Sequence, residues 1–456
     1  MTTRRQQRLG HRQPSAPRER VRVDTTAAVS GPIWRQYLRA LGPGLVTGAS
    51  DDDPSGIATY AQTGATFGLT MLWAALLTLP LMSAVQEICD RTALASGESM
   101  GRLITLKFAA RWRMLIAVLL AALIVANMLN IAADLVAIGE GMNLLHAGPV
   151  WIWALLAGMV VTALIVSGSF HLIARVFKVL CLALLAYVAV LVVVHVPWAH
   201  VAEHTVIPHV QLSKDYFALL AGVLGTTISP YLFFWQSVHR LEEMRDEPDG
   251  GPDNVEPLAE RGSARSRLKE RTSRLDVFTG MGFSNLVMFS IIVATAVTLG
   301  AHGHHDIQDA AQAAQGLRPV AGRFAATVFA LGFIGSGMLA VPVLAGAGSA
   351  GMAGLLGKPS GFSRSVREAP VFYLLVAAGT VGGMILSLVG VDPVHLLVFV
   401  AIVNGIAAAP FLVVVMVIAG DRTIMGDYTN GRLANLLGWA TVVLMAAAAF
   451  AVLATL

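Results

Sequence analysis

Ser50-Asp51-Asp52-Asp53-Pro54-Ser55-Gly56 interrupts an apolar stretch that covers residues 41–63. Proline removes a backbone N–H group and clashes with the preceding helical turn, and glycine lowers the cost of unwinding a helix. A second apolar stretch, residues 217–238, carries a similar interruption, Gly225-Thr226-Thr227-Ile228-Ser229-Pro230-Tyr231. In lipid, freed backbone groups need partners, so broken helices occur where they line a cavity enclosed by protein. The sequence therefore predicts two broken membrane helices.

The composition of the whole chain indicates a membrane protein. The chain has 456 residues, of which 55% are hydrophobic and only 13% are charged. A soluble domain carries about 25% charged residues, so this chain has too little polar surface for a globule in water. The two cysteines, Cys89 and Cys181, lie inside apolar stretches and indicate no disulfide framework. We predict an all-α integral membrane protein.

Apolar stretches of about 20 residues predict about eleven membrane-spanning helices. They cover residues 41–63, 67–88, 114–137, 149–166, 172–194, 217–238, 278–299, 324–345, 371–389, 394–418 and 434–456. Basic residues gather in every second connection, and of the 32 lysines and arginines only Lys214, Arg318 and Arg323 depart from this pattern. Because short cytoplasmic loops carry the excess of basic residues, we expect a multi-pass protein of the cell membrane with a cytoplasmic N-terminus and an outer C-terminus.

The positions of the two breaks predict an internal repeat. They lie in the first and sixth spans, and transporters built from inverted repeats bind their substrate where two broken helices meet. We expect a basic cytoplasmic tail (1–40), a first repeat of five spans (41–200), a second repeat of five spans (201–418), and a cytoplasmic loop with the eleventh span (419–456). Residues 242–276 mix charged residues with proline and glycine, which predicts a mobile cytoplasmic linker.

Asp51, Asp52 and Asp53 are the strongest sign of a functional site. A carboxylate inside a membrane helix costs at least ~2.5 kcal/mol on insertion scales and normally faces a cavity or a partner. Three consecutive residues spread over most of a helical turn, so they cannot all face one site. We expect Asp53 to face a ligand beside the break, and Asp51 and Asp52 to serve the access path, packing or charge compensation. Oxygen donors of this kind suit hard cations such as Mg²⁺, Ca²⁺ and Mn²⁺.

These motifs resemble the Nramp family of divalent-metal transporters, whose fold is of the LeuT type. The resemblance runs from about residue 41 to the C-terminus. Its markers are Gly42-Pro43-Gly44, Asp53-Pro54-Ser55-Gly56, Asn130-Ile131-Ala132-Ala133-Asp134-Leu135, Ala409-Pro410-Phe411, Ile424-Met425-Gly426 and Asn430. The resemblance implies a LeuT-type five-plus-five inverted repeat, a metal-binding carboxylate at Asp53, and a backbone carbonyl of Thr226 that points into the second break.

Three positions depart from the pattern of that family. Gly56 stands where the family has an asparagine ligand, Ser229 where it has a methionine, and Tyr231 where it has a histidine. Loss of the thioether removes the soft donor that favours transition metals, and Mg²⁺ tends to keep several waters in a roomy site. The predicted metal site, Asp53, Gly56, Thr226 and Ser229, therefore favours Mg²⁺ or Mn²⁺ and looks like the Nramp-related magnesium transporter branch.

The proton pathway of the family is also altered in this chain. Asp134 is present, but Ala137 stands where the family has a glutamate, and Tyr231 and Gln236 stand where it has two histidines. Neither replacement titrates near neutral pH, so we predict weak or absent proton coupling. Two interpretations of Asp134 stay open, an ion-pathway residue or a buried carboxylate paired with a neighbouring helix. Asn404 is either a pathway residue or a partner in an interhelical hydrogen bond.

Other functions fit the sequence less well. One alternative is a proton-coupled importer of Mn²⁺ or Fe²⁺; another is a LeuT-type symporter of organic solutes, which the acidic run disfavours because such carriers bind a substrate carboxylate. Enzyme motifs such as Gly-x-Gly-Asp, His-Glu-x-x-His in a span, or a Walker loop do not occur. We expect no enzyme activity, no cofactor, no nucleic acid and no obligate protein partner, only a divalent metal substrate and the lipid bilayer.

Overall fold

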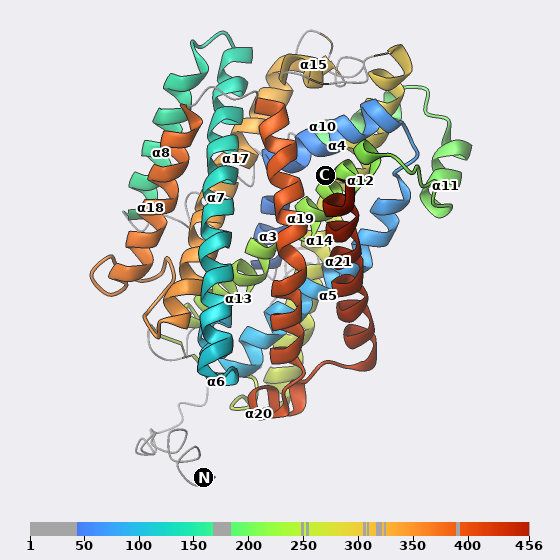
Figure 1. Cartoon of the computed structure of the whole chain (residues 1–456). Coiled ribbons are helices and arrows are strands. Elements are labelled where there is room, and N and C mark those ends of the chain that lie inside the picture. The colour runs from blue at the N-terminus through green and yellow to red at the C-terminus, as the bar shows by residue number, and fades with distance from the viewer. Residues whose placement is uncertain are drawn as a thin grey trace, which may run out of the picture. The chain divides into compact units, whose positions relative to one another are not determined.

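The computed structural model describes residues 43–166, 184–247, 250–251, 255–303, 307, 310–315, 322, 325–388 and 393–455. Helices provide the regular structure in these ranges, and no strand occurs within them (Figure 1). The predicted basic tail and most of the predicted fifth span lie outside the described residues. An all-α architecture is therefore confirmed for the part of the chain that the structure describes.

Both predicted breaks are present. The first span consists of α3 (Pro43–Asp51) and α4 (Pro54–Phe67), and the sixth consists of α12 (Lys214–Thr227) and α13 (Pro230–Arg245). In each pair the second helix begins with its proline, Pro54 or Pro230. Proline is well tolerated at a first helical position, where its missing N–H group would have no helical partner in any case. The same residues thus end one helix and start the next.

The remaining spans are continuous helices. They are α5 (Trp73–Ser96), α7 (Ala110–Leu144), α8 (Val150–Val166), α14 (Ser263–Thr298), α17 (Ala325–Leu355), α18 (Pro370–Ser387), α19 (Pro393–Ala419) and α21 (Arg432–Thr455), with α10 (Leu185–Val193) at the end of the predicted fifth span. Shorter helices connect them: α6 (Met100–Lys107), α11 (Trp198–Val206), η2 (Gly300–His302), α15 (Ala310–Gln315), α20 (Arg422–Met425) and η4 (Gly426–Tyr428).

Seven helices of the described ranges, counting α12 and α13 together, are long and apolar enough to cross a membrane. The predicted number is larger for physical reasons. The halves α3 and α4 are short, α8 has 17 residues, and the second half of α5 carries Glu87, Asp90 and Arg91. Large apolar side chains are exposed on several helices, among them Met114 at 69%, Leu374 at 70% and Phe450 at 73%. Such surfaces suit contact with lipid.

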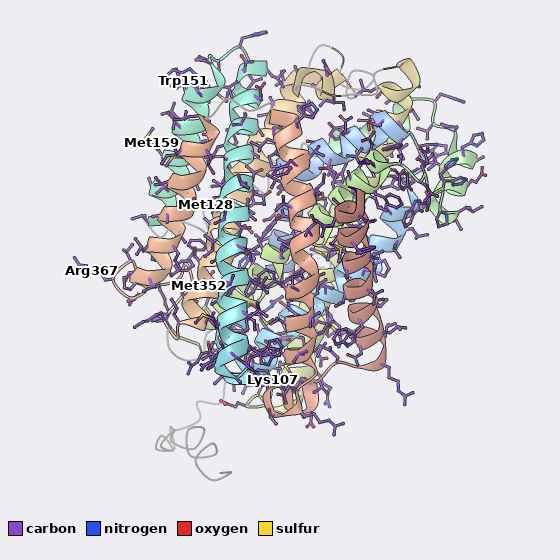
Figure 2. All side chains as sticks on the ribbon, viewed as in Figure 1. Lys107, Met128, Trp151, Met159, Met352 and Arg367 are labelled. Carbon is purple, nitrogen blue, oxygen red and sulfur yellow. The ribbon has the colours of Figure 1, made fainter. Side chains whose placement is uncertain are left out.

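The two ends of the helical layers carry different residues. Lys107, at the end of α6, and Trp151, at the start of α8, lie at opposite ends of the molecule (Figure 2). Lys107 belongs to a connection rich in basic residues, which we expect in the cytoplasm, and Trp151 follows the next connection, which has no lysine or arginine. The structure thus places these two consecutive connections at opposite ends of the molecule, as the alternating charge pattern predicts.

Close backbone contacts hold the broken helices in place. A Cβ atom at Gly48 of α3 would lie 2.2 Å from the carbonyl oxygen of Gly280 in α14. A Cβ atom at Gly225 of α12 would lie 2.1 Å from the carbonyl oxygen of Ala401 in α19. Small residues allow membrane helices to approach this closely, and side chains at either glycine would force the helices apart. Each broken span is therefore packed against a continuous helix.

The predicted linker over residues 242–276 is helical at both of its ends. Helix α13 continues to Arg245 and α14 begins at Ser263. The charges that suggested a solvated linker pair with one another: Lys269 Nζ lies 2.7 Å from Glu243 and 2.7 Å from Glu247. These ion pairs stabilise the two helical ends of the segment. A disordered loop can have the same composition, so composition alone did not predict the helices.

Candidate metal site

Asp53 lies at the first break and has two separate tasks. Its Oδ1 atom accepts hydrogen bonds from the Gly56 amide at 2.8 Å and from Ser55 Oγ at 2.6 Å, which caps the start of α4. Its Oδ2 atom lies 3.4 Å from the hydroxyl of Tyr231, in the first turn of α13. The same hydroxyl lies 3.4 Å from the carbonyl oxygen of Ser50 in α3. The two breaks therefore meet at Asp53 and Tyr231, as the repeat hypothesis predicts.

The half-helices α3 and α12 end at Asp51 and Thr227, just before Asp53 and Tyr231 in the sequence. The last carbonyls of a helix have no helical partner and carry partial negative charge, which favours a cation. At the end of α12, Ser229 Oγ lies 2.6 Å from the carbonyl oxygen of Gly225 and 2.8 Å from that of Thr226. The Ser229 hydroxyl thus covers the end of its own helix, while each carbonyl oxygen keeps a second lone pair for a ligand.

Tyr60 is a site residue that we did not predict. Its hydroxyl lies 3.0 Å from Thr226 Oγ1, so it connects α4 to α12 across the two breaks. Its ring also borders Gly56: a Cβ atom at residue 56 would lie 3.3 Å from Tyr60 Cε2 and 3.3 Å from the carbonyl oxygen of Asp51. The space that a larger side chain at position 56 would need is thus lined by an aromatic ring. The one sequence signal is that residue 60 lies one helical turn after residue 56, on the same face.

Asp51 and Asp52 share a hydrogen-bond partner on α14. Both are fully buried, and Ser284 Oγ of α14 lies 2.5 Å from Asp51 Oδ2 and 3.2 Å from Asp52 Oδ1. Asp51 and Asp52 thus bond to α14, whereas Asp53 caps α4 and lies next to Tyr231. That the three carboxylates have different roles stays a prediction. Their other oxygens, Asp51 Oδ1 and Asp52 Oδ2, have no hydrogen-bond partner within the described part of the protein. Burial of an unsatisfied polar group costs about 1–3 kcal/mol, so these atoms mark a region suited to water or ions.

Asp134 and Asn404 are both buried polar residues. Neither carboxylate oxygen of Asp134 on α7, and neither side-chain atom of Asn404 on α19, forms a hydrogen bond to any residue that the structure describes. Asp134 lies close enough to Asp53 and to Tyr231 to interact electrostatically with both. The two structural interpretations, a carboxylate paired with a neighbouring helix and an interhelical amide bond, therefore find no support in the described residues.

Gln236, which we predicted among the residues of the ion pathway or coupling, lies in a buried polar network. Its Nε2 atom donates to Asp90 Oδ1 at 2.7 Å, and its Oε1 atom accepts from Thr47 Oγ1. Arg240, one turn further along α13, lies 2.6 Å from Asp90 and 3.1 Å from Asp276, both buried. Asp276 in turn accepts a hydrogen bond of 2.7 Å from the Gly44 amide, at the start of α3. The polar contacts of Gln236 therefore belong to a buried network that links α3, α5, α13 and α14, rather than to Asp53.

The groups at the breaks that could bind a metal ion offer oxygen atoms, and most of these groups are neutral. Across the described ranges, no group of three or more histidine, cysteine, aspartate or glutamate side chains lies close enough to hold a metal ion. A cation at the meeting point of the breaks would instead find the Asp53 carboxylate, backbone carbonyls such as that of Thr226, and the hydroxyls of Ser229 and Tyr231. Such a set suits a hard cation that retains part of its water shell.

Comparison with known proteins finds a matching family and several relatives. Residues 44–455 match the family model described as natural resistance-associated macrophage protein-like (Nramp). The chain is 25% identical over 429 residues to the divalent metal cation transporter MntH of Aeromonas hydrophila, covering 91% of this chain and 95% of the relative. It is 27% identical over 407 residues to MntH of Verminephrobacter eiseniae, with 85% and 83% covered.

Solved structures show the same fold. A crystal structure of the Eremococcus coleocola manganese transporter, in complex with an aromatic bis-isothiourea substituted compound, matches with a TM-score of 0.72. The match covers 97% of this chain and 89% of that chain at 16% sequence identity. At this identity the similarity concerns the arrangement of the helices, which is the LeuT-type arrangement predicted above.

Proposed function

Because the chain belongs to the Nramp family, we propose that it carries divalent metal cations across the membrane by alternating access, with Asp53 as the central ligand. The family is one of transporters, so the chain is a multi-pass membrane transporter and not an enzyme. A metal ion is its substrate rather than a cofactor. The relatives named as divalent metal cation transporters support the divalent charge of the substrate. We also propose residues 41–200 and 201–418 as the two repeats, with the N-terminus in the cytoplasm.

The observation that carries the proposal is the contact between the two breaks. Asp53 Oδ2 and the Tyr231 hydroxyl lie 3.4 Å apart, and these two residues follow the ends of α3 and α12 in the sequence. A negative oxygen donor surrounded by neutral oxygen donors replaces part of the hydration shell of a hard cation. An organic substrate carboxylate would meet Asp53 at short range and be repelled, which disfavours the alternative of an organic solute symporter.

Mg²⁺ and Mn²⁺ are the proposed substrates. The residues at the meeting point that we assign to the metal, Asp53, Thr226 and Ser229, offer oxygen atoms and no sulfur, which favours hard cations over Fe²⁺. Gly56 offers no side-chain donor, so water would complete the coordination, as Mg²⁺ prefers. The similarity to proteins named for manganese supports Mn²⁺, and the oxygen-only donor set supports Mg²⁺.

Uptake by the purified protein in liposomes tests this proposal. We expect Mg²⁺ and Mn²⁺ to enter faster than Fe²⁺ in a reducing buffer, with uptake lost in Asp53→Ala. Asp215→Asn is the matched control, because it removes an exposed carboxylate from the first turn of α12 and should leave uptake unchanged. Equal uptake by wild type and Asp53→Ala would refute the site, and a clear preference for Fe²⁺ would favour the alternative of a transition-metal importer.

A further inference from the structure

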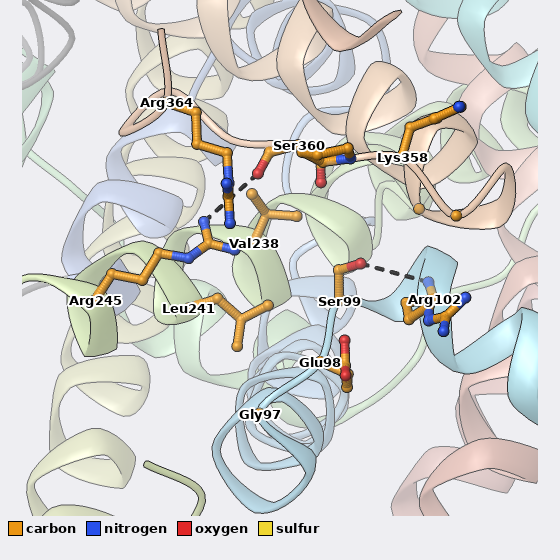
Figure 3. Close-up of a pocket in the computed structure, with 13 residues that line it drawn as sticks. Gly97, Glu98, Ser99, Arg102, Val238, Leu241, Arg245, Lys358, Ser360 and Arg364 are labelled. Carbon is orange, nitrogen blue, oxygen red and sulfur yellow. Dashed lines mark hydrogen bonds between the residues drawn. The ribbon is translucent and has the colours of Figure 1, made fainter. Parts of the chain in front are cut away.

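A cavity of about 280 Å³ lies beside the end of α13 that is remote from Tyr231 (Figure 3). Three parts of the chain that are far apart in sequence form its walls. They are the α5–α6 connection with the start of α6, the last turns of α13, and the α17–α18 connection. By the distribution of basic residues in the sequence, these segments are expected on the cytoplasmic side. The cavity is thus separate from the site at the breaks.

The walls of this cavity carry an excess of positive charge. Arg102, Arg245, Lys358 and Arg364 line it, and Glu98 is the only acidic side chain among the lining residues that the structure describes. A further carboxylate, Glu242, lies behind the wall, where its Oε1 atom accepts hydrogen bonds from the backbone amides of Phe362 and Ser363. Even if the charge of Glu242 offsets that of Arg245, the basic side chains around the cavity outnumber the acidic ones.

The lining groups suit one class of ligand. Arginine presents a planar array of N–H donors that matches the oxygens of a phosphate group, and lysine adds a compact charge. The hydroxyls of Ser99 and Ser360 add polar groups to the same walls. The cavity is smaller than the 300–1,000 Å³ of typical sites for drug-sized ligands, so a small anion fits better than an extended one. We propose that this cavity binds a phosphate group, carried either by a membrane lipid or by a soluble phosphate.

A phosphate here would act on the helix that reaches the metal site. Tyr231, in the first turn of α13, contacts Asp53, and Arg245, in its last turn, lines the cavity. Arg245 already lies 3.5 Å from the Ser360 carbonyl of the α17–α18 connection, and a bound anion would strengthen that junction. Because coupling between two sites is reciprocal, occupancy of the cavity and metal binding would then influence each other. Only this consequence, and not the phosphate binding, rests on the proposed function.

Thermal unfolding of the full-length protein in detergent tests the binding. Phosphate is titrated against chloride at constant ionic strength, with four variants. We expect a saturable stabilisation by phosphate that needs about tenfold more anion in Arg364→Gln, since a charge-assisted hydrogen bond is lost. Arg367→Gln is the matched control, because this exposed arginine belongs to the same connection but does not line the cavity (Figure 2). Glu98→Gln should lower the concentration required, and Lys358→Gln replaces Arg364→Gln if the latter does not fold.

The lipid arm of the experiment separates the two sources. In micelles of a maltoside detergent, which contains no phosphate, added phosphate should stabilise the protein whether the natural ligand is a lipid or a soluble phosphate. In nanodiscs that contain phosphatidic acid, a lipid-filled cavity would already be stabilised and would respond weakly to phosphate, whereas a site for soluble phosphate would respond as before. Equal responses of Arg364→Gln and Arg367→Gln, or equal effects of phosphate and chloride, would overturn the proposal. Mn²⁺ binding, measured on the same samples, should be retained in Arg364→Gln, so failure of this proposal is distinguishable from failure of the metal site.

Discussion

At the scale of single residues, Asp53 combines a structural and a functional role. One oxygen caps α4 through Gly56 and Ser55, and the other faces Tyr231. The sequence predicted Asp53 because proline and glycine follow it directly. It did not predict Ser284 as the neighbour of Asp51 and Asp52, or Tyr60 as the neighbour of Thr226. Those contacts join residues more than 160 positions apart, and helix periodicity does not determine which faces of two distant helices meet.

The double role of Asp53 predicts different effects of two substitutions. Asp53→Asn keeps an oxygen that can accept the Gly56 hydrogen bond, so the protein should fold with little loss of stability but lose metal transport. Asp53→Ala should lose transport and also about 1 kcal/mol of stability, because the helix cap is removed. Thermal unfolding and liposome uptake, measured on the same preparations, check this separation. Normal uptake by Asp53→Asn would show that the carboxylate charge is not needed.

At the scale of elements, the breaks were predictable, but the helical structure of residues 263–276 at the start of α14 was not. Proline and glycine end a helix through local sterics, so the limits of α3, α4, α12 and α13 follow from short motifs. The start of α14 at Ser263 depends on charge pairs such as Lys269–Glu243, which connect two helices. Local composition cannot distinguish such pairs from solvated charges. For the same reason, the network around Arg240 was not predicted.

The buried network predicts a large loss of stability when Arg240 is removed. Arg240→Met would leave Asp90 and Asp276 buried without their cation, and breaking a buried ion pair costs about 3–5 kcal/mol. Arg274→Met is the control, because the half-exposed Arg274 pairs with Glu270 and Glu87, and surface pairs contribute about 0–1 kcal/mol. Chemical unfolding in detergent should separate the two variants clearly. Similar losses in both would contradict the importance of the buried network.

The ion pair between Lys107, at the end of α6, and Asp421, which precedes α20, should make the stability of the protein depend on pH. Asp421 lies 2.6 Å from Lys107 Nζ and caps α20 by accepting a hydrogen bond from the Thr423 amide. Partial burial acts to raise the pKa of Asp421, but the hydrogen bonds from Lys107 and Thr423 together lower it below the usual value of an aspartate. A carboxyl group whose pKa is lower in the folded state stabilises the protein above its unfolded-state pKa, and this contribution disappears as the pH falls through the folded-state pKa.

Asp421→Asn should therefore be less stable than the wild type at neutral pH. The difference should shrink below about pH 4, where the aspartate of the unfolded chain begins to be protonated. Unfolding temperatures of both proteins between pH 3 and pH 7 check this expectation. A difference that stays constant over the whole range would show that the charge of Asp421 contributes nothing.

At the scale of the whole molecule, two pairs of half-helices meet around one buried carboxylate. The family match from residue 44 to residue 455 and the structural similarity support a LeuT-type transporter. The overall arrangement was predictable because apolar length, helix breakers and the distribution of basic residues act on large segments. The metal and the energy source depend on single residues at one site, such as Ser229 and Tyr231, and so remain proposals.

Replacement of the titrating residues of the family predicts that transport is not strictly coupled to protons. Tyr231 and Gln236 do not titrate near neutral pH, and Gln236 bonds with Thr47 and Asp90 instead of the metal site. We expect metal uptake into liposomes without matching acidification, driven by the metal gradient and the membrane potential. A pH-sensitive dye enclosed with a metal indicator measures both at once. Acidification strictly proportional to metal entry would contradict this prediction.

The position of a bound metal tests the central claim most directly. Anomalous X-ray scattering from crystals grown with Mn²⁺ locates that ion independently of any assay of transport. We predict an anomalous peak at the meeting point of the two breaks, in contact with Asp53 and next to the carbonyl end of α12 at Thr226. The peak should be absent in crystals of Asp53→Ala. A peak elsewhere in the protein, or one that persists in Asp53→Ala, would contradict the claim that the two broken helices form the metal site.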